Sequence, residues 1–331
     1  MQQLQVSSVE AGQRLDKYLA KFMPKAPGSF FYKMLRKKNI TLNGKKAAGN
    51  EKLSEGDIIK LFLADETIQN FKNDNSTNVE HSIKEAKEKL DILFEDEEMI
   101  VINKPSGMLS QKARPEDISL VEYIESYVAG QNEDSANIFK PGICNRLDRN
   151  TTGLIVAGKT IRSLQYLNQL FREREIAKYY LCLVKGALKK TAHINGYLVK
   201  DTSHNKVKIS QQKSEGSVPI VTAYEPLGTG QWAGEIYTLL KVHLITGKSH
   251  QIRAHLQSIG HPIVGDTKYG EKQMFHQFKK DFGVKHQLLH AWQLNIPAVE
   301  YIPEKYQGKC FEAPLPTLFQ KVLDALEINA Y

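Results

Sequence analysis

The spacing of hydrophobic and polar residues changes several times along the chain, so the sequence predicts both helices and strands. Apolar residues at helical spacing occupy 15–22, and a second apolar face follows in 29–38, where Ser29 is the expected N-cap. Further helical faces are expected at residues 161–171, 250–259 and 318–326. Short apolar or alternating runs predict strands at residues 40–45, 57–63, 90–95, 99–103, 153–158, 177–184, 218–227, 237–245 and 288–297. The first 64 residues therefore read as a small α+β unit that precedes a longer, strand-rich region.

Charge and polarity divide the chain at the same place. Residues 1–64 hold 12 lysine and arginine residues against 5 acidic ones, whereas the whole chain has a net charge of only +8. Residues 65–88 are polar and show no apolar periodicity, which predicts a flexible linker. A second domain is expected over 89–331. A basic module attached to a nearly neutral domain suggests that the module binds a polyanion.

The overall composition of this 331-residue chain is that of a soluble globular protein, with 41% hydrophobic and 25% charged residues. No apolar run approaches the roughly 18 residues that a membrane span needs, and the N-terminus lacks the pattern of a signal peptide. Cys144, Cys182 and Cys310 are far apart, which argues against a disulfide framework and a zinc knuckle. A reducing, cytoplasmic location is expected. Cys144 has no adjacent base that would make it a nucleophile.

Residues 145–153, Asn-Arg-Leu-Asp-Arg-Asn-Thr-Thr-Gly, carry the most suggestive chemistry. Asp148 lies between Arg146 and Arg149, and in an extended segment Arg146 and Asp148 point to the same side. An arginine beside a carboxylate favours its ionised form, which can act as a nucleophile or general base. Guanidinium groups can also hold phosphates. Taken alone, such a string is more often a solvated ion pair than a catalytic site.

The string resembles the signature of the RluA family of pseudouridine synthases, which reads His-Arg-Leu-Asp-x-x-Thr-Ser-Gly. Asn145 stands at the family's His and Thr152 at its Ser. The resemblance implies that Asp148 is the catalytic residue. It also implies that Arg146 inserts into the RNA helix and stabilises a flipped-out base. It leaves the role of Asn145 open.

Other blocks resemble the same family in the same order. The strand around Ala177–Val184 contains a Lys-x-Tyr pattern, which implies that Tyr180 stacks on uracil. The block from Thr246 to Leu256 implies that Arg253 pairs with Asp148. Lys104, in an earlier block, either binds phosphate, lines the site or only caps its turn. Asp266, in a glycine-bounded turn, is read as structural.

The N-terminal order of helix, helix, strand, Asn-Gly turn and strand resembles the RNA-binding module of small-subunit ribosomal protein S-four, over about residues 12–64. The resemblance implies that basic side chains there contact phosphates. These are Lys33, Arg36, Lys37, Lys38, Lys45 and Lys46. Residues 200–217, with Lys200, His204 and three further lysines, form a basic loop or hairpin that either reaches RNA or is simply solvated.

The resemblance implies an α+β catalytic domain with a mixed, largely antiparallel sheet, flanking helices and a cleft carrying Asp148. The expected reaction is the isomerisation of uridine in structured RNA, most like that of bacterial synthases acting on large-subunit ribosomal RNA. No cofactor is expected, and no metal, because no carboxylate or cysteine completes a set with His250 and His255. A monomer without membrane contact is expected.

Three alternatives stay open at this point. The target RNA could be transfer RNA or small-subunit ribosomal RNA. The protein could be a catalytically silent RNA-binding or ribosome-assembly factor. It could also be a hydrolase that uses Asp148 and Asp266 on a nucleoside and releases uracil.

Overall fold

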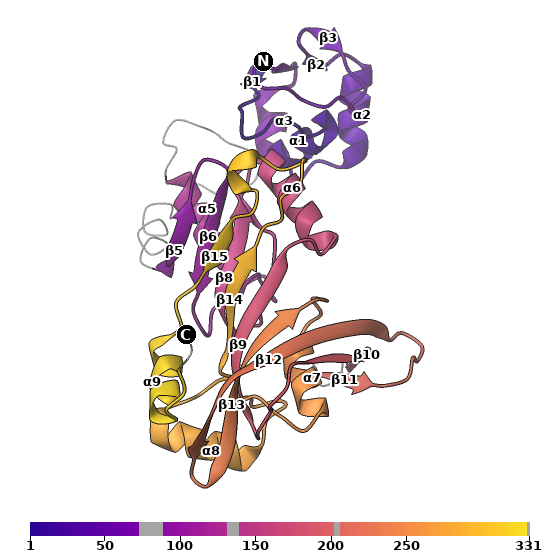
Figure 1. Ribbon diagram of the computed structural model, residues 1–331. Coiled ribbons are helices and arrows are strands. Elements are labelled where there is room, and N and C mark those ends of the chain that lie inside the picture. The colour runs from indigo at the N-terminus through magenta and orange to yellow at the C-terminus, as the bar shows by residue number, and fades with distance from the viewer. Residues whose placement is uncertain (73–88, 131–138, 202–205, 330–331) are drawn as a thin grey trace.

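The computed structural model describes residues 1–72, 89–130, 139–201 and 206–329 (Figure 1). The N-terminal unit is a four-stranded sheet in the order β1-β4-β2-β3, with two helices packed on it and a third following β4. Its elements are β1 (Gln2–Gln5), α1 (Leu15–Phe22), α2 (Gly28–Arg36), β2 (Ile40–Leu42), β3 (Lys45–Lys46), β4 (Ile58–Leu61) and α3 (Asp65–Phe71). The predicted order of helix, helix, strand, turn and strand is confirmed.

Three details of this unit differ from the prediction. Helix α2 begins at Gly28 with Pro27 as its N-cap, so Ser29 is inside the helix rather than capping it. The linker was expected to start at residue 65, but 65–71 form α3, whose Ile68 is buried in the N-terminal core. The remaining linker residues, 73–88, lie outside the described part of the chain. Strand β1 was not predicted because its Gln-Gln-Leu-Gln sequence carries one apolar residue, and it forms by pairing with β4.

The second unit is built on one large sheet, and its α+β class is confirmed. The central strand order is β11-β10-β12-β13-β9-β14-β8-β6-β5, and β15 and β7 pair with β14 and β8. Among the described strands every pairing is antiparallel except that of β8 with β14, as expected for a mixed, largely antiparallel sheet. The strands are β5 (Ile92–Glu95), β6 (Met99–Lys104), β7 (Gly142–Ile143), β8 (Thr152–Gly158), β9 (Ala177–Lys185), β10 (Ala192–Asp201), β11 (Lys206–Ser210), β12 (Val218–Trp232), β13 (Glu235–Leu244), β14 (Leu289–Asn295) and β15 (Cys310–Glu312).

Helices cover both faces of this sheet. They are α5 (Leu120–Ala129), α6 (Ile161–Arg172), α7 (Gln251–Ser258), α8 (Lys272–Phe282), the 3₁₀ turn η1 (Glu304–Tyr306) and α9 (Thr317–Ala325). Helices α5 and α7 share a core with Tyr180, Cys182 and Val184 on one face of β9, while α8 and α9 pack over Leu181 and Leu183 on the other. This alternation follows from the period of two along a strand. It places Tyr180 on the face that carries the α7 segment.

The two units touch at the start of α6, on which the N-terminal unit rests in Figure 1. The backbone N–H of Ile161 donates to the carbonyl of Val9 at 3.0 Å, and the Gln165 side chain donates to the carbonyl of Gly12 at 3.4 Å. None of the helices in the described ranges combines the length and apolar composition that a membrane crossing requires.

Candidate active site

The loop that carries Asp148 joins β7 to β8 and is fixed to the sheet on both sides. Asn145 binds the edge of β8 twice: its amide donates to the carbonyl of Leu154 at 3.0 Å and its oxygen accepts the N–H of Val156 at 2.9 Å. The hydroxyl of Ser110 bonds both the N–H and the carbonyl of Leu147, at 3.0 and 2.8 Å. These bonds hold the backbone on the N-terminal side of Asp148. They give Asn145, whose role the sequence left open, a clear part in positioning the loop.

Gly153, the second residue of β8, lets this strand approach β14. Its φ angle is +108°, and a Cβ atom there would lie 2.2 Å from the carbonyl oxygen of Ala291. No other residue fits such a contact with the backbone of the neighbouring strand. The glycine at this position is therefore required by packing.

Lys104 stabilises the backbone around the loop that carries Asp148. Its side chain is fully buried, and its ammonium donates to the carbonyls of Pro105, Met108 and Arg149 at 2.8, 2.9 and 3.0 Å. Burial lowers the pKa of Lys104 to about 7, and the nearby Asp148 carboxylate opposes that shift. Of the roles considered from sequence, capping the turn is confirmed. A group with three protein acceptors and no exposure has no room for phosphate.

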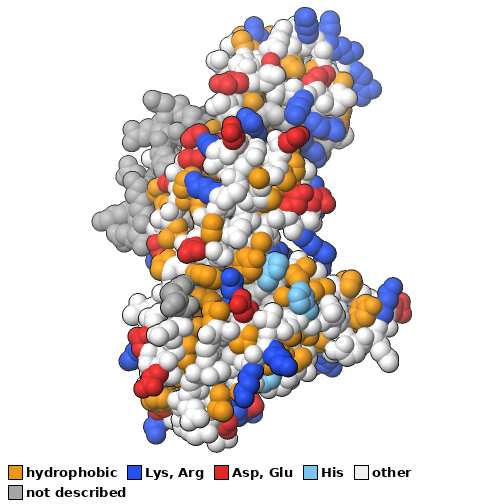
Figure 2. Space-filling view, viewed as in Figure 1, with side chains coloured by type: hydrophobic (Ala, Val, Ile, Leu, Met, Phe, Trp, Pro, Cys, Tyr) orange, Lys and Arg blue, Asp and Glu red, His pale blue; other side chains and the backbone are white. Residues whose placement is uncertain are grey.

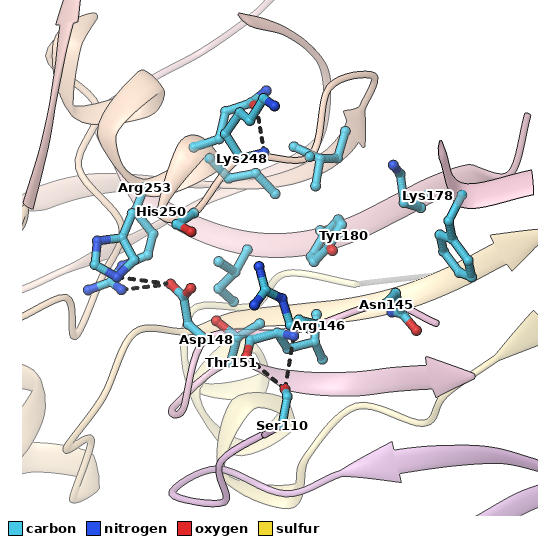
Figure 3. A pocket seen from close by; sticks show the side chains of 18 of the residues that line it. Ser110, Asn145, Arg146, Asp148, Thr151, Lys178, Tyr180, Lys248, His250 and Arg253 are labelled. Carbon is cyan, nitrogen blue, oxygen red and sulfur yellow. Dashed lines mark hydrogen bonds and ion pairs between the residues drawn. The ribbon is translucent and has the colours of Figure 1, made fainter. Parts of the chain in front are cut away.

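Asp148 contacts Arg253, as the family resemblance implied. Arg253 Nη1 donates to Asp148 Oδ2 at 2.8 Å, while its Nε and Nη2 donate to the two oxygens of Asp266 at 2.6 and 2.9 Å. The Asp266 side chain is fully buried, whereas 23% of the Asp148 side chain is exposed. Burial alone would raise the pKa of Asp266, but Arg253 and two backbone N–H groups lower it below its usual value. One guanidinium is thus held by a buried carboxylate and presented to a partly exposed one. Figure 3 shows its contact with Asp148.

His250 approaches the same oxygen of Asp148 as Arg253 does. It precedes α7 in the left-handed conformation, with φ +56°, so it is not on the helix face where the sequence placed it. Its Nε2 is 3.8 Å from Asp148 Oδ2, and its Nδ1 is 3.0 Å from the hydroxyl of Tyr269. That hydroxyl also accepts the N–H of Val207 in β11 at 2.9 Å. Burial lowers the pKa of His250, although the Asp148 charge opposes this.

A cavity of about 530 Å³ opens above these groups. Tyr180 from β9, Arg146 and Asp148 from the loop, and Lys248 and Arg253 from the α7 segment all line it, as Figure 3 shows. Burial and the Asp148 charge raise the pKa of Tyr180 well above its ordinary value, so the phenol stays protonated. The cavity therefore combines an aromatic surface, one carboxylate and several cations.

Comparison with known proteins assigns this arrangement to a family. Residues 98–258 match the RNA pseudouridylate synthase family. An uncharacterised RNA pseudouridine synthase of Mycoplasma pneumoniae is 31% identical over 323 residues, which are 95% of each chain. The ribosomal large subunit pseudouridine synthase C of Haemophilus ducreyi is 32% identical over 324 residues, 97% of this chain and 94% of the relative. Human RNA Pseudouridylate Synthase Domain Containing 4 shares the fold, with a TM-score of 0.60 at 23% identity over 75% of this chain and 98% of that one.

The chain belongs to the RluA-type family of RNA pseudouridine synthases. The enzyme is thus an isomerase whose partner is RNA. The resemblance drawn from the Asp148 signature and the blocks around Tyr180 and Arg253 is confirmed at the level of the family.

Asp266 is not a second free carboxylate in the synthase. Both of its oxygens bond Arg253, and Oδ1 also accepts the N–H groups of Lys268 and Tyr269 at 2.8 and 3.0 Å. This agrees with its reading as structural. A hydrolase that uses Asp148 and Asp266 as two working carboxylates would need one that reaches substrate, and Asp266 does not.

Two other candidate groups are also placed by the structure of the synthase. Cys144 lines the cavity, but burial raises its pKa to about 12, so it remains a thiol. His255 is buried against Thr222, with 2.8 Å between its Nδ1 and the hydroxyl, and does not face His250. No group of three or more potential metal ligands occurs among the described residues.

The six basic residues of the N-terminal unit that were predicted to contact phosphates are exposed and lie on α2, the turn after it and the β2–β3 hairpin. They are Lys33, Arg36, Lys37, Lys38, Lys45 and Lys46. Figure 2 shows lysine and arginine side chains gathered on that end of the synthase. Arg149 is exposed as well, but its guanidinium bonds the carbonyl of Gly107 at 2.9 Å and it does not line the cavity. Arg146 and Asp148 share the cavity side, as the alternation predicted.

Sequence reasoning missed two contributors to the site. The pairing of Asp266 with Arg253 had no local signal, because the turn that carries Asp266 folds back onto α7 from 13 residues away. Lys178 lines the cavity two residues before Tyr180, on the same face of β9. The period of two along the strand contained that signal.

Proposed function

We propose that this synthase converts uridine to pseudouridine in large-subunit ribosomal RNA, with Asp148 as the group that acts on the nucleotide. The observation that carries the proposal is the Asp148–Arg253 pair at the base of a cavity that also contains Tyr180. The carboxylate is partly exposed, so it can reach a substrate, and it is aimed by a guanidinium that is itself fixed.

The reaction breaks the bond from ribose to a ring nitrogen, rotates the uracil and rejoins it through a ring carbon. The same atoms leave and return, so the rearrangement consumes no cosubstrate. The target base must first leave its stack, which costs a few kcal/mol. Arg146, exposed at the cavity edge, fills the gap or stabilises the extruded base, and the ring of Tyr180 stacks on the uracil. Asp148 then attacks the ribose or the ring, or abstracts a ribose proton.

The choice of RNA is supported by the names of relatives and by the N-terminal unit. The relatives in Haemophilus ducreyi and Nitrosomonas europaea are named ribosomal large subunit pseudouridine synthases C and D. Exposed lysines and arginines over α2 and β3 offer a sequence-independent grip on phosphates, which suits a structured RNA. We propose that the enzyme acts as a monomer.

The test compares RNA from cells with and without this chain. A carbodiimide marks pseudouridine, and reverse-transcription stops are mapped across ribosomal and transfer RNAs. We expect a stop in large-subunit RNA that vanishes on deletion. It should return with the wild type and should not return with Asp148→Ala. An Asp148→Glu control should restore it only in proportion to the activity of that variant. A lost stop in transfer RNA or small-subunit RNA would reassign the target.

An unchanged map in every RNA class would sink the isomerase proposal and favour the catalytically silent RNA-binding factor. Release of free uracil from RNA by the purified enzyme would instead favour the hydrolase.

A further inference from the structure

Lys178 is a nearly buried cation that has no partner among the residues the structure describes. It lies on β9 and only 9% of its surface is exposed, yet its side chain lines the cavity. Among the described residues, no hydrogen bond or ion pair reaches its ammonium. Lysine is almost never buried to this extent unless it is paired, because desolvating a charge is costly. Figure 3 shows Lys178 on the same strand as Tyr180, at the end of the cavity away from Arg253.

Among the described residues, the charge that acts on Lys178 is that of another cation. Burial lowers the pKa of Lys178, and the charge of Arg174 lowers it further. Lys178 is in turn one of the charges that lower the pKa of His243, after burial. A Cβ atom on Gly247 would lie 3.7 Å from the Lys178 ammonium, so the glycine leaves the space beside it open.

The charges that line the cavity do not balance. Asp148 is its sole acidic lining residue in the described part of the chain, and Arg253 already pairs with it. Four other lining cations have no acidic partner among the described residues. They are Arg146, Arg174, Lys178 and Lys248. A cavity with this surplus of positive charge is suited to a ligand that carries an anionic group.

We propose that Lys178, with Arg174 beside it, binds a phosphate of the RNA backbone next to the uridine that enters the cavity. This rests on the proposed function, in which that uracil stacks on Tyr180. Two residues along a strand separate Lys178 from Tyr180 by about 6–7 Å. That span suits a base on the tyrosine and a phosphate, either 5′ or 3′ of the same nucleoside, on the lysine. Lys178 is then a substrate-binding residue that orients the nucleotide relative to Asp148.

The first test measures the binding of mononucleotides to the full chain by ligand-observed NMR. Uridine, uridine 5′-monophosphate and uridine 3′-monophosphate are compared on the wild type, Lys178→Met and Lys178→Arg. Lys190→Met, which removes an exposed lysine outside the cavity, is the matched control. A charge-assisted bond in a partly closed site should give one monophosphate roughly tenfold tighter binding than uridine. The monophosphate that gains identifies the 5′ or the 3′ phosphate.

We expect this preference to disappear in Lys178→Met and to persist in Lys178→Arg and Lys190→Met. Equal binding of uridine and both monophosphates, a preference that survives Lys178→Met, or no mononucleotide binding at all would overturn the proposal. The assay measures binding and involves no chemistry. A failure of the isomerase proposal therefore leaves this result interpretable as nucleotide binding.

The second test needs no ligand. If the Lys178 ammonium is unpaired in the free enzyme, replacing it with methionine removes a desolvated charge, and the unfolding temperature of Lys178→Met should rise. A lysine with a structural partner would give the opposite result. An unchanged or lower unfolding temperature would contradict the premise of the proposal.

Discussion

The contact of one arginine with two carboxylates allows a prediction that separates stability from catalysis. Asp266 is fully buried and bonds Arg253 through two parallel contacts, whereas Asp148 accepts one bond and is 23% exposed. Replacing Asp266 by asparagine leaves Arg253 buried with only one charged partner. Breaking a buried pair in this way costs about 3–5 kcal/mol. Asparagine keeps one oxygen acceptor in place, so we expect a loss of about 3 kcal/mol.

Asp148→Asn is the matched control. It removes the same charge from the same arginine but leaves the buried Arg253–Asp266 pair intact and neutral as a whole. We therefore expect its free energy of unfolding to stay within about 1 kcal/mol of the wild type, as for substitutions that leave no buried charge unpaired. The isomerisation rate should fall to background in Asp148→Asn. In Asp266→Asn the isomerisation should also slow, because Arg253 no longer holds Asp148 in position. We expect this loss to appear mainly in the rate constant of the chemical step and less in the affinity for RNA.

Urea unfolding at neutral pH measures both variants, and single-turnover isomerisation on substrate RNA measures the chemistry. For a domain of this size, 3 kcal/mol corresponds to roughly 6–12 °C in the unfolding temperature. The pKa of Asp266 is lowered in the folded state, so its stabilising effect is full above the ordinary value of 3.8 and is lost as the pH falls below it. The gap between Asp266→Asn and the wild type should then close in acid. Equal stability losses in the two variants would refute the reasoning, as would an Asp266→Asn enzyme as stable as the wild type.

Four further predictions follow from single features of the structure. Tyr180→Phe should bind substrate RNA as tightly as the wild type, whereas Tyr180→Leu should lose about 1–3 kcal/mol of binding in a filter assay, because stacking needs the ring; equal losses would contradict this. Lys104→Met leaves three loop carbonyls without donors and should reduce the free energy of unfolding by roughly 3 kcal/mol, and a variant as stable as the wild type would show that the loop does not depend on these bonds. Burial lowers the pKa of His290 to about 4, so the unfolded state takes up its proton first and stability should fall as the pH drops from 6.5 to 4; His290→Gln should flatten that slope in urea unfolding. Replacing four N-terminal cations by glutamine should lower the salt slope of RNA binding by about 3, while a matched set on α8 and α9 should not. The first set is Arg36, Lys37, Lys38 and Lys45, and the control set is Lys272, Lys279, Lys280 and Lys321.

The sequence predicted the parts of the site that depend on local order. Strand periodicity placed Tyr180 on the opposite face from Leu181, and the cores on the two faces confirm it. The pairing of Arg253 with Asp148 came from the family resemblance and is present at 2.8 Å. The roles of these residues in catalysis stay predictions.

Other features could not be predicted because they depend on contacts between chain segments that come together only in the folded protein. Of the two alternatives for residues 200–217, a loop or a hairpin, the structure has the hairpin, because Tyr197–Asp201 of β10 pair with Lys206–Ser210 of β11. His204 lies outside the described residues. Helix α8 was missed since its sequence is mostly polar, with Met274 and Phe278 as its buried positions. His250 was placed on a helix, but its left-handed backbone turns its ring toward Tyr269 and Asp148. The burial of α8 and the orientation of His250 depend on partners from other parts of the chain.

The distribution of charge in the cavity explains why such a site can orient a nucleotide before any chemistry. At one end, Arg253 is bound on both sides by carboxylates, so Asp148 is fixed and its charge is already matched. At the other end, Lys178 is desolvated and has no partner in the described part of the chain, a state that the Lys178→Met unfolding experiment tests. If Lys178 binds the phosphate as proposed, a nucleotide would relieve only the unpaired charge of Lys178, because its phosphate would pair with the lysine while its neutral base faced the carboxylate. On this proposal, binding energy gained at the phosphate would place the glycosidic bond near Asp148, and it would be available only to a substrate that carries both groups.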